Sequence, residues 1–429
     1  MCIVTQIIKK VNTVFEPNFL KTLAQETKFI RRERVIKPKE FLVHHLFLEL
    51  EEGPNSLTDV LIEFNKDNIS LTKQGLNKRY TQEACDFFQR VLEELINFST
   101  QERSVLNSIP FVKNIKVADS STIRLNKQLA QVFPGLRNHG ATLKLQAAMN
   151  VVTNQLHSLE LRPSRENDQS YTKYLDCIEK EDLSINDLGY FCIDSFKKIE
   201  EKGAFFLSRF LKSTNVYHAD PHMGGDKIEL APVLETTKKN RVELNILLGK
   251  SKFKCRLVAL RLPPKAYNQR IKNLQEKQRK NGHSKTKSTI FDKWTIFVTN
   301  LPDSINADTL LTLYGLRWQI ELFFKMAKTV LNLRKINYTN AYRSLISLYV
   351  SLIAIAVLGL ISMTITHKEL SFYKAGKILK KNIRAFFDLI NTKSNAIAWL
   401  AQKITAFALK ETRPNRPSTR RKLSRGTSF

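Results

Sequence analysis

The chain has 429 residues, 42% of them hydrophobic and 25% charged, which suggests about two to four domains with a large core and excludes a disordered protein. Lysine and arginine number 69 against 40 acids, and the net charge of +29 favours a polyanionic partner, with nucleic acid ahead of an anionic membrane surface. Five scattered cysteines without a Cys-x2-Cys pair argue against a zinc ribbon and a disulfide framework, and the N-terminal residues lack the apolar core of a signal peptide, so a reducing cytoplasm is expected.

Residues 1–107 are mainly helical by pattern, and we expect them to form a DNA-binding domain. Ser56 and Asp59 match a capping box before an apolar run. Residues 70–80 are interpreted as a second short helix with the basic residues Lys73, Lys78 and Arg79. Two helices across a short turn, the second of them basic, have the layout of a helix-turn-helix, and an ordinary helical hairpin is the alternative. Residues 82–96 have apolar side chains at helical spacing and predict a core helix.

Residues 108–212 change to an α/β order and are expected to be the first part of a catalytic core. β-Branched residues alternate with polar ones up to Asp119, which predicts a strand that ends at this acid. Asp187 is placed at the end of a later, shorter strand. The predicted elements are strands at 112–118, 141–152 and 155–161, a helical link at 171–181, a strand at 183–188, a helix at 192–202 and a strand at 204–211 that contains Arg209.

Residues 213–289 are interpreted as a β-rich insertion into that core. Strands are expected at residues 228–234, 242–248 and 253–262. Between residues 264 and 288, eight lysines or arginines stand against one acid, so this stretch is either a basic helix lying on phosphates or a mobile, solvated arm. The motif His218-x-Asp220-x-His222 lacks a third ligand at suitable spacing and is interpreted as a turn.

Residues 290–366 are expected to complete the core. A strand at 294–300 precedes a helix predicted at 314–328, and at about 100° per residue four polar side chains of this helix share one stripe. These residues are Tyr314, Arg317, Glu321 and Lys328. A helix this apolar is mostly buried, so its charged residues need partners or a ligand. A structural row of ion pairs is the simpler interpretation.

The C-terminal part combines a long apolar segment with a basic end. Residues 345–365 carry no formal charge and are interpreted as a buried core helix, with a membrane span as the alternative. Residues 367–429 are expected to form a helical region followed by a disordered tail. The six basic residues of that tail would contact phosphates only nonspecifically.

Three acids suit phosphodiester cleavage with two metal ions. Such a mechanism needs carboxylates from separate elements that hold two divalent cations about 4 Å apart. Asp119, Asp187 and Glu321 are predicted on two strand ends and a helix, and their hard oxygen ligands are those that Mg²⁺ prefers. Asp182 and Asp194 compete with Asp187 for this role, although Asp194 is more simply an acid at a helix start.

The polar residues of the 314–328 helix resemble a known signature. The spacing Tyr314-x2-Arg317-x3-Glu321-x6-Lys328 is similar to the YREK signature of DDE transposases of the IS-four type. The segments Val-Ala-Asp119-Ser-Ser-Thr and Asn-Asp187-Leu-Gly-Tyr-Phe resemble that family's first two catalytic blocks. Together these blocks cover residues 110–335.

The resemblance implies a fold and a set of residue roles. The fold would be α/β, an RNase H-like core with a mixed five-stranded sheet, interrupted by the β-rich insertion and flanked by helical N- and C-terminal regions. Asp119, Asp187 and Glu321 would hold two Mg²⁺ ions, for which Mn²⁺ can substitute. The DNA would be contacted by Tyr314, Arg317, Lys328 and Arg209.

The implied function is that of an insertion-sequence transposase. It would bind terminal inverted repeats, nick the DNA to free a 3′-hydroxyl and transfer that hydroxyl to target DNA. Its partners would be double-stranded DNA and a second copy of itself in a synaptic dimer, in the bacterial cytoplasm at the nucleoid and away from membranes. Some members of the family form DNA hairpins with the help of an aromatic residue of the insertion, and the absence of Trp between Asp187 and Lys293 leaves hairpin use open. The alternatives are an inactive, transposase-derived DNA-binding protein and a single-span membrane protein.

Overall fold

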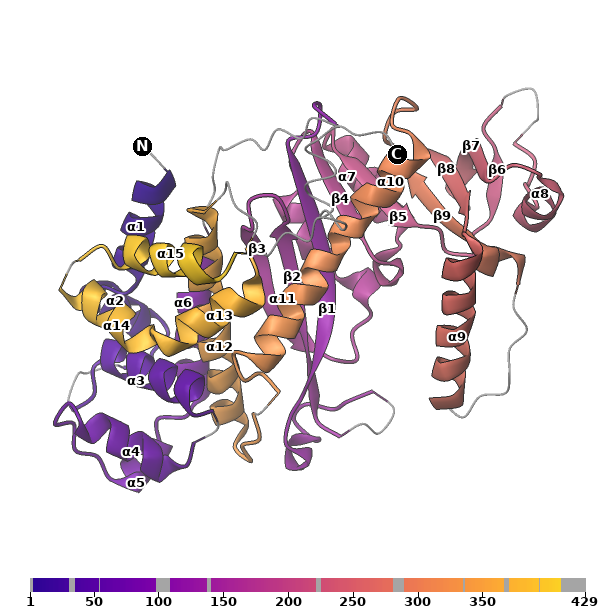
Figure 1. The fold of residues 1–429 in the computed structure, drawn as a ribbon. Helices are drawn as coiled ribbons and strands as arrows, with labels where there is room; N and C mark the ends of the chain where they lie inside the picture. Colours follow the sequence, from indigo (N-terminus) through magenta and orange to yellow (C-terminus); the bar gives the residue numbers. More distant parts are fainter. Residues whose placement is uncertain are drawn as a thin grey trace. The chain divides into compact units, whose positions relative to one another are not determined.

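The structure, a computed structural model, describes residues 3–30, 35–53, 55–97, 109–136, 140–220, 225–280, 289–334, 336–365, 370–392 and 394–409. The chain divides into two compact units. The first unit is mostly helical (Figure 1) and comprises Met1–Arg103, Asp119–Asn167 and Trp318–Arg416. The second unit contains most of the strands and comprises Ser104–Ala118, Asp168–Arg317 and Pro417–Phe429.

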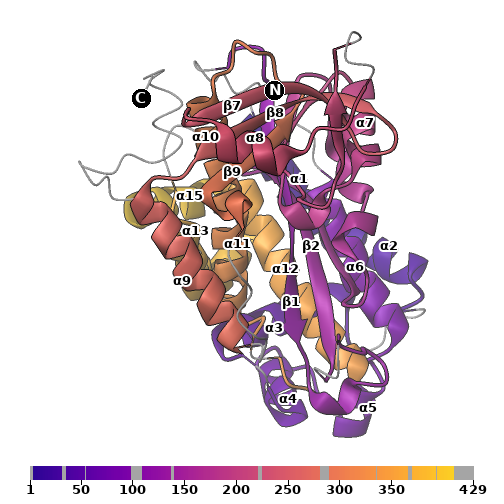
Figure 2. The ribbon, with the colours of Figure 1, turned by 90° about the vertical axis from the view of Figure 1, so that its right-hand side faces the viewer.

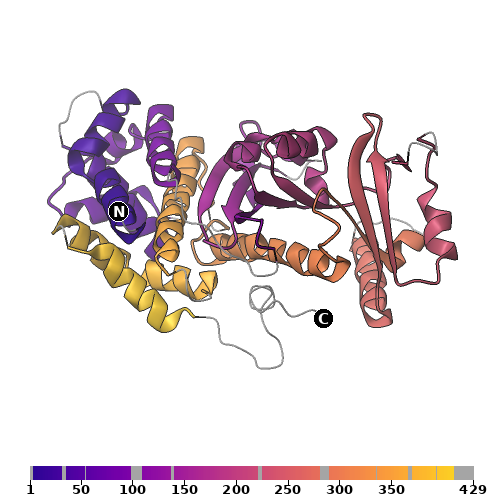
Figure 3. The same cartoon turned by 90° about the horizontal axis from the view of Figure 1, so that it is seen from above.

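Helices from both ends of the sequence make up the first unit. Those before the sheet are α1 (Ile3–Val14), α2 (Pro17–Glu26), α3 (Pro38–Glu51), α4 (Leu57–Asn65), α5 (Lys73–Asn77) and α6 (Gln82–Ile96). Those after it are α11 (Trp318–Thr329), α12 (Ala341–Met363), α13 (Phe372–Lys381), α14 (Ile383–Asn391) and α15 (Ala396–Phe407). The early and late helices lie beside one another (Figure 3), because α14 packs on α3 and α15 on α1. The hydrophobic core of this unit is therefore shared between distant parts of the chain.

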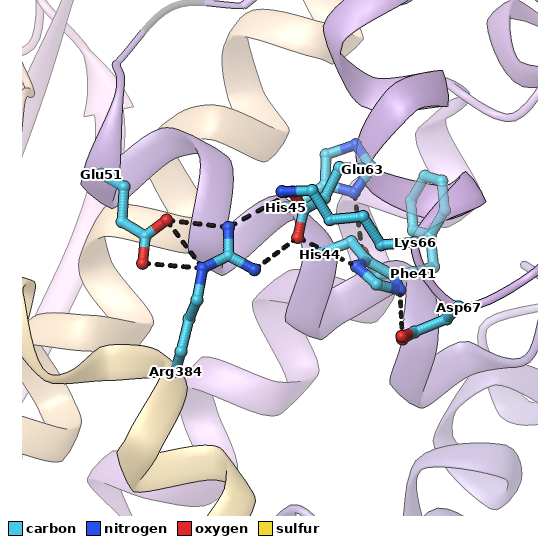
Figure 4. Close-up of polar contacts among 8 residues, drawn as sticks. All are labelled: Phe41, His44, His45, Glu51, Glu63, Lys66, Asp67 and Arg384. Carbon is cyan, nitrogen blue, oxygen red and sulfur yellow. Dashed lines mark hydrogen bonds and ion pairs between the residues drawn. The ribbon is translucent and has the colours of Figure 1, made fainter.

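An ion-pair cluster ties the late helices to the early ones (Figure 4). Arg384 of α14 donates through Nε to Glu51 Oε1 over 2.9 Å and through Nη1 to Glu63 Oε1 over 2.6 Å. Lys66 Nζ donates to the other Glu63 oxygen over 2.6 Å. Burial alone would raise the pKa of Glu63, but the hydrogen bonds from Arg384 and Lys66 lower it to about 2. A buried carboxylate with several charged donors is stable as an ion, and through it Arg384 connects α14 to α3 and α4.

The prediction of a buried core helix at residues 345–365 is confirmed by α12. Among the described residues it is the one helix long and apolar enough to cross a membrane, and 89% of its most apolar 18-residue window is buried inside the structure. It packs against α3 and α6. Its buried serines are hydrogen-bonded: Ser347 Oγ donates to Glu49 Oε2 over 2.7 Å and Ser351 Oγ to the Leu331 carbonyl over 2.9 Å.

The helix pair predicted near the N-terminus is present, with a second helix shorter than expected. Ser56 Oγ accepts from the Asp59 amide over 3.1 Å and Asp59 Oδ2 accepts from the Ser56 amide over 2.6 Å, which is the capping box read from the sequence. α5 has only five residues, about one and a half turns. The predicted core helix at 82–96 coincides with α6.

Strand β1 (Asn114–Arg124) belongs to both units, because their boundary falls after Ala118. In the first unit it neighbours β2 (Thr142–Asn150), which pairs antiparallel with β3 (Leu156–Pro163). In the second unit β1 pairs in parallel with β4 (Asp182–Asn186), and β4 in parallel with β5 (Phe205–Arg209). The predicted strands of residues 108–212 are confirmed, with one correction: β1 does not end at Asp119 but runs on to Arg124, and the β-branched residues Thr122 and Ile123 suit this extension.

Beyond β5 the second unit continues the sheet with antiparallel strands. The order is β5-β9-β8-β7-β6, formed by β9 (Trp294–Thr299), β8 (Phe253–Arg261), β7 (Arg241–Leu248) and β6 (Val216–His218). The described strands thus follow a nine-stranded order, where a sheet of five was expected. The insertion pairs edge to edge with β9, which satisfies backbone groups that a free edge would leave open.

One strand predicted in the insertion is wrong. Residues 228–234 were expected to be extended, but the structure has a helix, α8 (Leu230–Thr236). Pro232 explains the difference, because proline cannot donate to a strand ladder and is tolerated in the first turn of a helix.

The basic stretch after β8 is helical at α9 (Pro264–Lys280), which projects from the strands as a separate helix (Figures 1 and 2). Residues 281–288 of that stretch lie outside the described residues, as do His222 and the tail at 412–429.

The helix predicted at 314–328 is interrupted. α10 (Ala307–Tyr314) ends at Tyr314, a 3₁₀ turn occupies Gly315–Arg317, and α11 begins at Trp318. The four signature residues therefore fall on three successive elements: Tyr314 on α10, Arg317 in the 3₁₀ turn, and Glu321 and Lys328 on α11. Glycine weakens a helix by about 1 kcal/mol relative to alanine, and Gly315 stands at the point where the α-helix tightens. The boundary between the two units falls directly after Arg317.

Candidate active site

Asp187 and Arg209 come together through the pairing of two parallel strands in the second unit. β4 ends at Asn186, which is in register with Ser208 of β5. Asp187 directly follows β4, and Arg209 is the last residue of β5. Because the carboxyl ends of parallel strands meet at one edge of a sheet, the acid and the base reach the same edge. The predicted strand at 183–188 contained Asp187, whereas β4 stops one residue before it, so Asp187 directly follows the strand.

Tyr314, the last residue of α10, brings its hydroxyl to Asp187. Tyr314 Oη donates to Asp187 Oδ1 over 3.4 Å, and its ring lies 5.1 Å from the Phe297 ring of β9. Burial raises the pKa of Tyr314 above its ordinary value, and Asp187 raises it further, while Arg317 and Arg209 oppose the rise. The hydroxyl is therefore protonated at neutral pH and can donate a hydrogen bond.

Arg317 and Arg209 surround the Asp187 edge with positive charge. The Arg317 guanidinium carbon lies 5.9 Å from the centroid of the Tyr314 ring, in the geometry of a cation–π contact. Arg270 of α9 lies close enough to Arg209 to feel its charge: burial lowers the pKa of Arg270, and Arg209 lowers it further. Several cations near a single half-buried carboxylate create a site for an anion, and guanidinium groups suit phosphates.

A buried arginine of the insertion holds the loop that leads into α10. Arg256 of β8 donates through Nη1 to the carbonyls of Pro302 and Ile305, over 3.1 and 2.8 Å. Its Nη2 also pairs with Glu243 of β7. Asn306 then caps the helix, because its side chain accepts from the Thr309 amide over 2.8 Å. Strands of the insertion thereby fix the start of the helix that carries Tyr314.

The two aspartates that compete with Asp187 have other surroundings. Asp182 is fully buried, and its Oδ2 lies 2.7 Å from Lys116 Nζ, which makes it part of a structural ion pair inside the sheet. Asp194 is exposed in the first turn of α7 (Ile193–Glu201), with Lys197 Nζ 3.8 Å away, as expected for an acid near a helix start. Of the three acids, Asp187 is the half-buried one that faces Tyr314.

Asp119 and Glu321 belong to the first unit. Asp119 is half-buried within β1, and its Oδ1 accepts from the Ser120 amide over 2.8 Å. Glu321 is half-buried in the first turn of α11, which confirms its position on a helix. Both residues are half-buried and sit on regular elements, which hold side chains more firmly than loops do.

Lys328, near the end of α11, faces a basic pocket of the same unit. The pocket has a volume of about 670 Å³ and is lined by Thr122, Arg124, Thr142, Lys328, Leu333 and Arg334, among others. Burial lowers the pKa of Lys328, and the charges of Arg334 and Arg124 lower it further. Sequence reasoning did not single out these two arginines. Their only signal is position: Arg124 ends the strand of Asp119, and Arg334 follows the helix of Glu321.

A protein-family model described as "Transposase DDE domain" matches residues 110–357, more than half of the chain and all three acids. The chain belongs to the DDE transposase family. It is therefore an enzyme of the polynucleotidyl-transferase type, and the expected family is confirmed.

This DDE transposase is similar along most of its length to transposases of insertion sequences. The one of IS231F from Bacillus thuringiensis subsp. israelensis is 24% identical over 413 residues, which are 89% of this chain and 87% of that protein. The one of IS1151 from Clostridium perfringens is 24% identical over 402 residues, 86% and 84% of the two chains. A solved piggyBac transposase synaptic complex with hairpin DNA aligns with 96% of this chain and 84% of its own, at 10% identity and a TM-score of 0.46.

The remaining predicted site residues of the transposase lie in its N-terminal helices. Lys73 is exposed on α5, Lys78 is exposed directly after it, and Arg79 is half-buried. Among the residues that the structure describes, no three His, Cys, Asp or Glu side chains form a group that could hold a metal ion.

Proposed function

We propose that this transposase moves an insertion sequence by cutting and joining DNA. It binds the terminal inverted repeats as double-stranded DNA, nicks them to free a 3′-hydroxyl and transfers that hydroxyl to target DNA. The observation that carries the proposal is Asp187 at the end of β4, with the Tyr314 hydroxyl on its carboxylate and two arginines beside it. This is a site for a phosphate next to an acid, in a chain whose family match spans Asp119 and Glu321 as well.

Asp119, Asp187 and Glu321 are the proposed ligands of two Mg²⁺ ions, for which Mn²⁺ can substitute. The donor set fits: all three are carboxylates, the hard oxygen ligands that Mg²⁺ takes, and all three are half-buried, neither sealed in the core nor fully solvated. When bound, such ions lower the pKa of the attacking water or hydroxyl and stabilise the leaving oxygen. Asp182 is a poor alternative, because its carboxylate is already used by Lys116.

The other site residues are proposed to hold the DNA. Tyr314 donates from a hydroxyl that keeps its proton, whereas Arg317 and Arg209 offer guanidinium forks to phosphate oxygens. Lys328 supplies a point charge from the other unit. Within the proposed N-terminal DNA-binding region, the phosphate contacts come from Lys73, Lys78 and Arg79.

We also propose an RNase H-like core and a cellular setting for this transposase. We assign the strands β3-β2-β1-β4-β5, with an antiparallel first pair and a parallel β1-β4-β5 group, to an RNase H-like core. The transposase is taken to act as a dimer in the synaptic complex, in the cytoplasm at the nucleoid. Net charge favours this setting, because +29 attracts DNA at long range.

A cleavage assay tests the proposal. Full-length protein is mixed with Mg²⁺ and a labelled duplex that carries the terminal repeat of the element encoding it, and nicking is followed on a denaturing gel. Glu321→Gln should abolish nicking while the affinity for the duplex stays within a few-fold. Glu276→Gln, an acid on α9 outside the proposed site, is the matched control and should nick like the wild type.

The same assay distinguishes an active transposase from an inactive, transposase-derived DNA-binding protein. If the wild type binds the repeat and never nicks it with Mg²⁺ or Mn²⁺, that alternative holds and the catalytic assignment falls. Nicking that survives Glu321→Gln would instead remove Glu321 from the proposed ligands.

A further inference from the structure

The pocket beside α11 combines a positive charge with a fixed shape. Arg124 and Arg334 are exposed and Lys328 is half-buried, and no acid is among the described residues that line the pocket. The two arginines lower the pKa of Lys328, so the three cations lie within electrostatic reach of one another. Three like charges around one open space repel, and an anion between them relieves that repulsion.

We infer that this pocket is a phosphate-binding subsite for a DNA strand, in which Arg124 and Arg334 are binding residues together with Lys328. The inference rests on the proposed function and adds to it a location and two residues.

The wall that carries Arg334 is held in place from both sides. Asn332 has a left-handed backbone, with φ of 62°, and its Nδ2 donates to the Glu49 carbonyl over 2.7 Å. On the far side, Tyr338 Oη donates to Glu49 Oε1 over 2.5 Å. Asparagine tolerates this backbone region better than most residues. The segment is therefore anchored to α3 before and after Arg334, and a pre-organised wall loses less entropy when it binds a ligand.

The wall that carries Arg124 is fixed as well. Arg124 is the last residue of β1, and the next amide, that of Leu125, donates to the Ala141 carbonyl over 2.9 Å. Asn126 Nδ2 then donates to the Asn337 carbonyl over 3.3 Å, which links this wall to the one with Arg334. The two arginines thus stand on connected, anchored segments.

The position of the pocket favours a DNA strand over a small phosphate compound. Arg124 lies five residues beyond Asp119 on the same strand, about 17 Å away at 3.3–3.4 Å per residue. Lys328 lies seven residues beyond Glu321 on the same helix, about 10 Å away at 1.5 Å per residue. A DNA strand rises about 3.4 Å per nucleotide, so a strand at the two acids reaches the pocket within about three to five nucleotides.

Salt-dependent binding tests the subsite. The affinity of full-length protein for a fluorescein-labelled duplex is measured by anisotropy between 50 and 200 mM salt. Each of Arg124→Ala and Arg334→Ala should reduce the slope of log K against log salt by about 0.9, the value for one lost phosphate contact. The double variant should bind about tenfold more weakly at the low-salt end, and Arg124→Lys with Arg334→Lys should restore much of the slope. Lys381→Ala, an exposed lysine at the end of α13 in the same unit, should leave the slope unchanged.

Two results overturn the inference. One is a double variant that keeps the wild-type slope and melts at the wild-type temperature. The other is protection of the wild type from thermal unfolding by inorganic pyrophosphate, lost in the double variant, while duplex binding stays equal in both: the pocket then holds a small phosphate compound. Failure of the proposed function looks different, because the wild type itself then fails to nick the terminal-repeat duplex while the slope change in the variants is still measurable.

Discussion

Two aspartates flank β4 and have different roles: Asp182 is the first residue of the strand, and Asp187 follows its last residue. Asp182 is fully buried, where its carboxylate accepts from Asn114 Nδ2 over 2.9 Å and pairs with Lys116 at 2.7 Å. Asp187, five residues later, is half-buried and faces Tyr314. Loss of one charge from a buried pair leaves the other without compensation, whereas a half-exposed acid can be changed with little cost in stability.

Asp182→Asn should therefore lower the free energy of unfolding by about 3 kcal/mol, because it removes the negative charge that lies 2.7 Å from the buried Lys116 ammonium. Asp187→Asn should abolish nicking and change that free energy by less than about 1 kcal/mol. Urea denaturation followed by circular dichroism measures both. Equal stability of the two variants would contradict the structural role of Asp182, and a fully active Asp187→Asn would contradict the catalytic role of Asp187.

For single residues, the sequence indicated which side chains could act in the site, but it did not indicate which contacts each side chain makes in the fold. The resemblance drew attention to Tyr314 and Asp187, and the structure places them in contact. Residue types and spacing alone could not separate Asp187 from Asp182, since the position of Lys116 in the neighbouring strand decides which acid is buried in an ion pair. Arg124 and Arg334 were missed because a lone arginine after a strand or helix has no pattern until the two elements pack.

Glu49 links helix α3 to the segment between α11 and α12. It is buried, and its carboxyl oxygens accept from Tyr338 Oη and Ser347 Oγ. Burial raises its pKa to about 7, while Tyr338, Ser347 and the charge of Arg343 act in the opposite direction. A carboxyl whose folded pKa exceeds its unfolded value of 4.5 binds a proton more readily in the native state. The stabilisation that Glu49 adds to the free energy of unfolding is complete below pH 4.5 and is lost as the pH rises through about 7.

The wild type should accordingly lose on the order of 2–3 kcal/mol of unfolding free energy from this group between pH 5 and pH 8. Glu49→Gln is neutral throughout and should show a flatter dependence over that range. The comparison uses urea denaturation at both pH values, with Glu52→Gln, an exposed neighbour, as the control. Parallel curves for the wild type and Glu49→Gln would show that Glu49 does not titrate in this window.

The Arg384 cluster predicts how the late helices depend on the early ones. Arg384→Ala removes both hydrogen-bonded forks and leaves Glu63 buried with Lys66 and His44, so stability should fall by about 3 kcal/mol. Arg384→Lys keeps the charge but cannot bridge Glu51 and Glu63 at once, and should lose about half as much. Thermal denaturation of the two variants against the wild type checks the order. An Arg384→Ala protein as stable as the wild type would mean that apolar packing alone holds α14.

Elements with a strong local period were predictable, and those decided by one residue or by distant partners were not. The boundaries of α6, and the strands β7 and β8, follow from regular spacing of apolar side chains. The strand expected where α8 forms ignored Pro232, and the helix expected through residue 315 ignored Gly315. The packing of α14 on α3 needs ion pairs between residues more than 300 positions apart, which no local pattern contains.

The last described helices complete the hydrophobic core of the first unit, so the stability of that unit depends on both ends of the described chain. Phe387 of α14 packs edge-on against Phe15, with ring centroids 4.9 Å apart, and contacts Phe47 of α3 at 5.9 Å. A chain that stops after residue 382 should therefore expose this core and accumulate as insoluble protein. A chain that stops after residue 409 keeps all the described helices and should stay soluble, as centrifugation of expressed material would show. Equal solubility of both would mean that α14 and α15 are dispensable.

The ion pair between Glu51 and Arg384 also determines when the N-terminal helices can complete their folding during synthesis. The two residues are separated by 333 positions, and at about 5–20 residues per second a ribosome needs about 17–67 s to travel between them. During that interval the nascent N-terminal helices lack the partners that complete their core. Chaperones have this long to act on the growing polypeptide, and a ribosome that stalls late would leave a product whose early part is fully translated yet unable to finish folding.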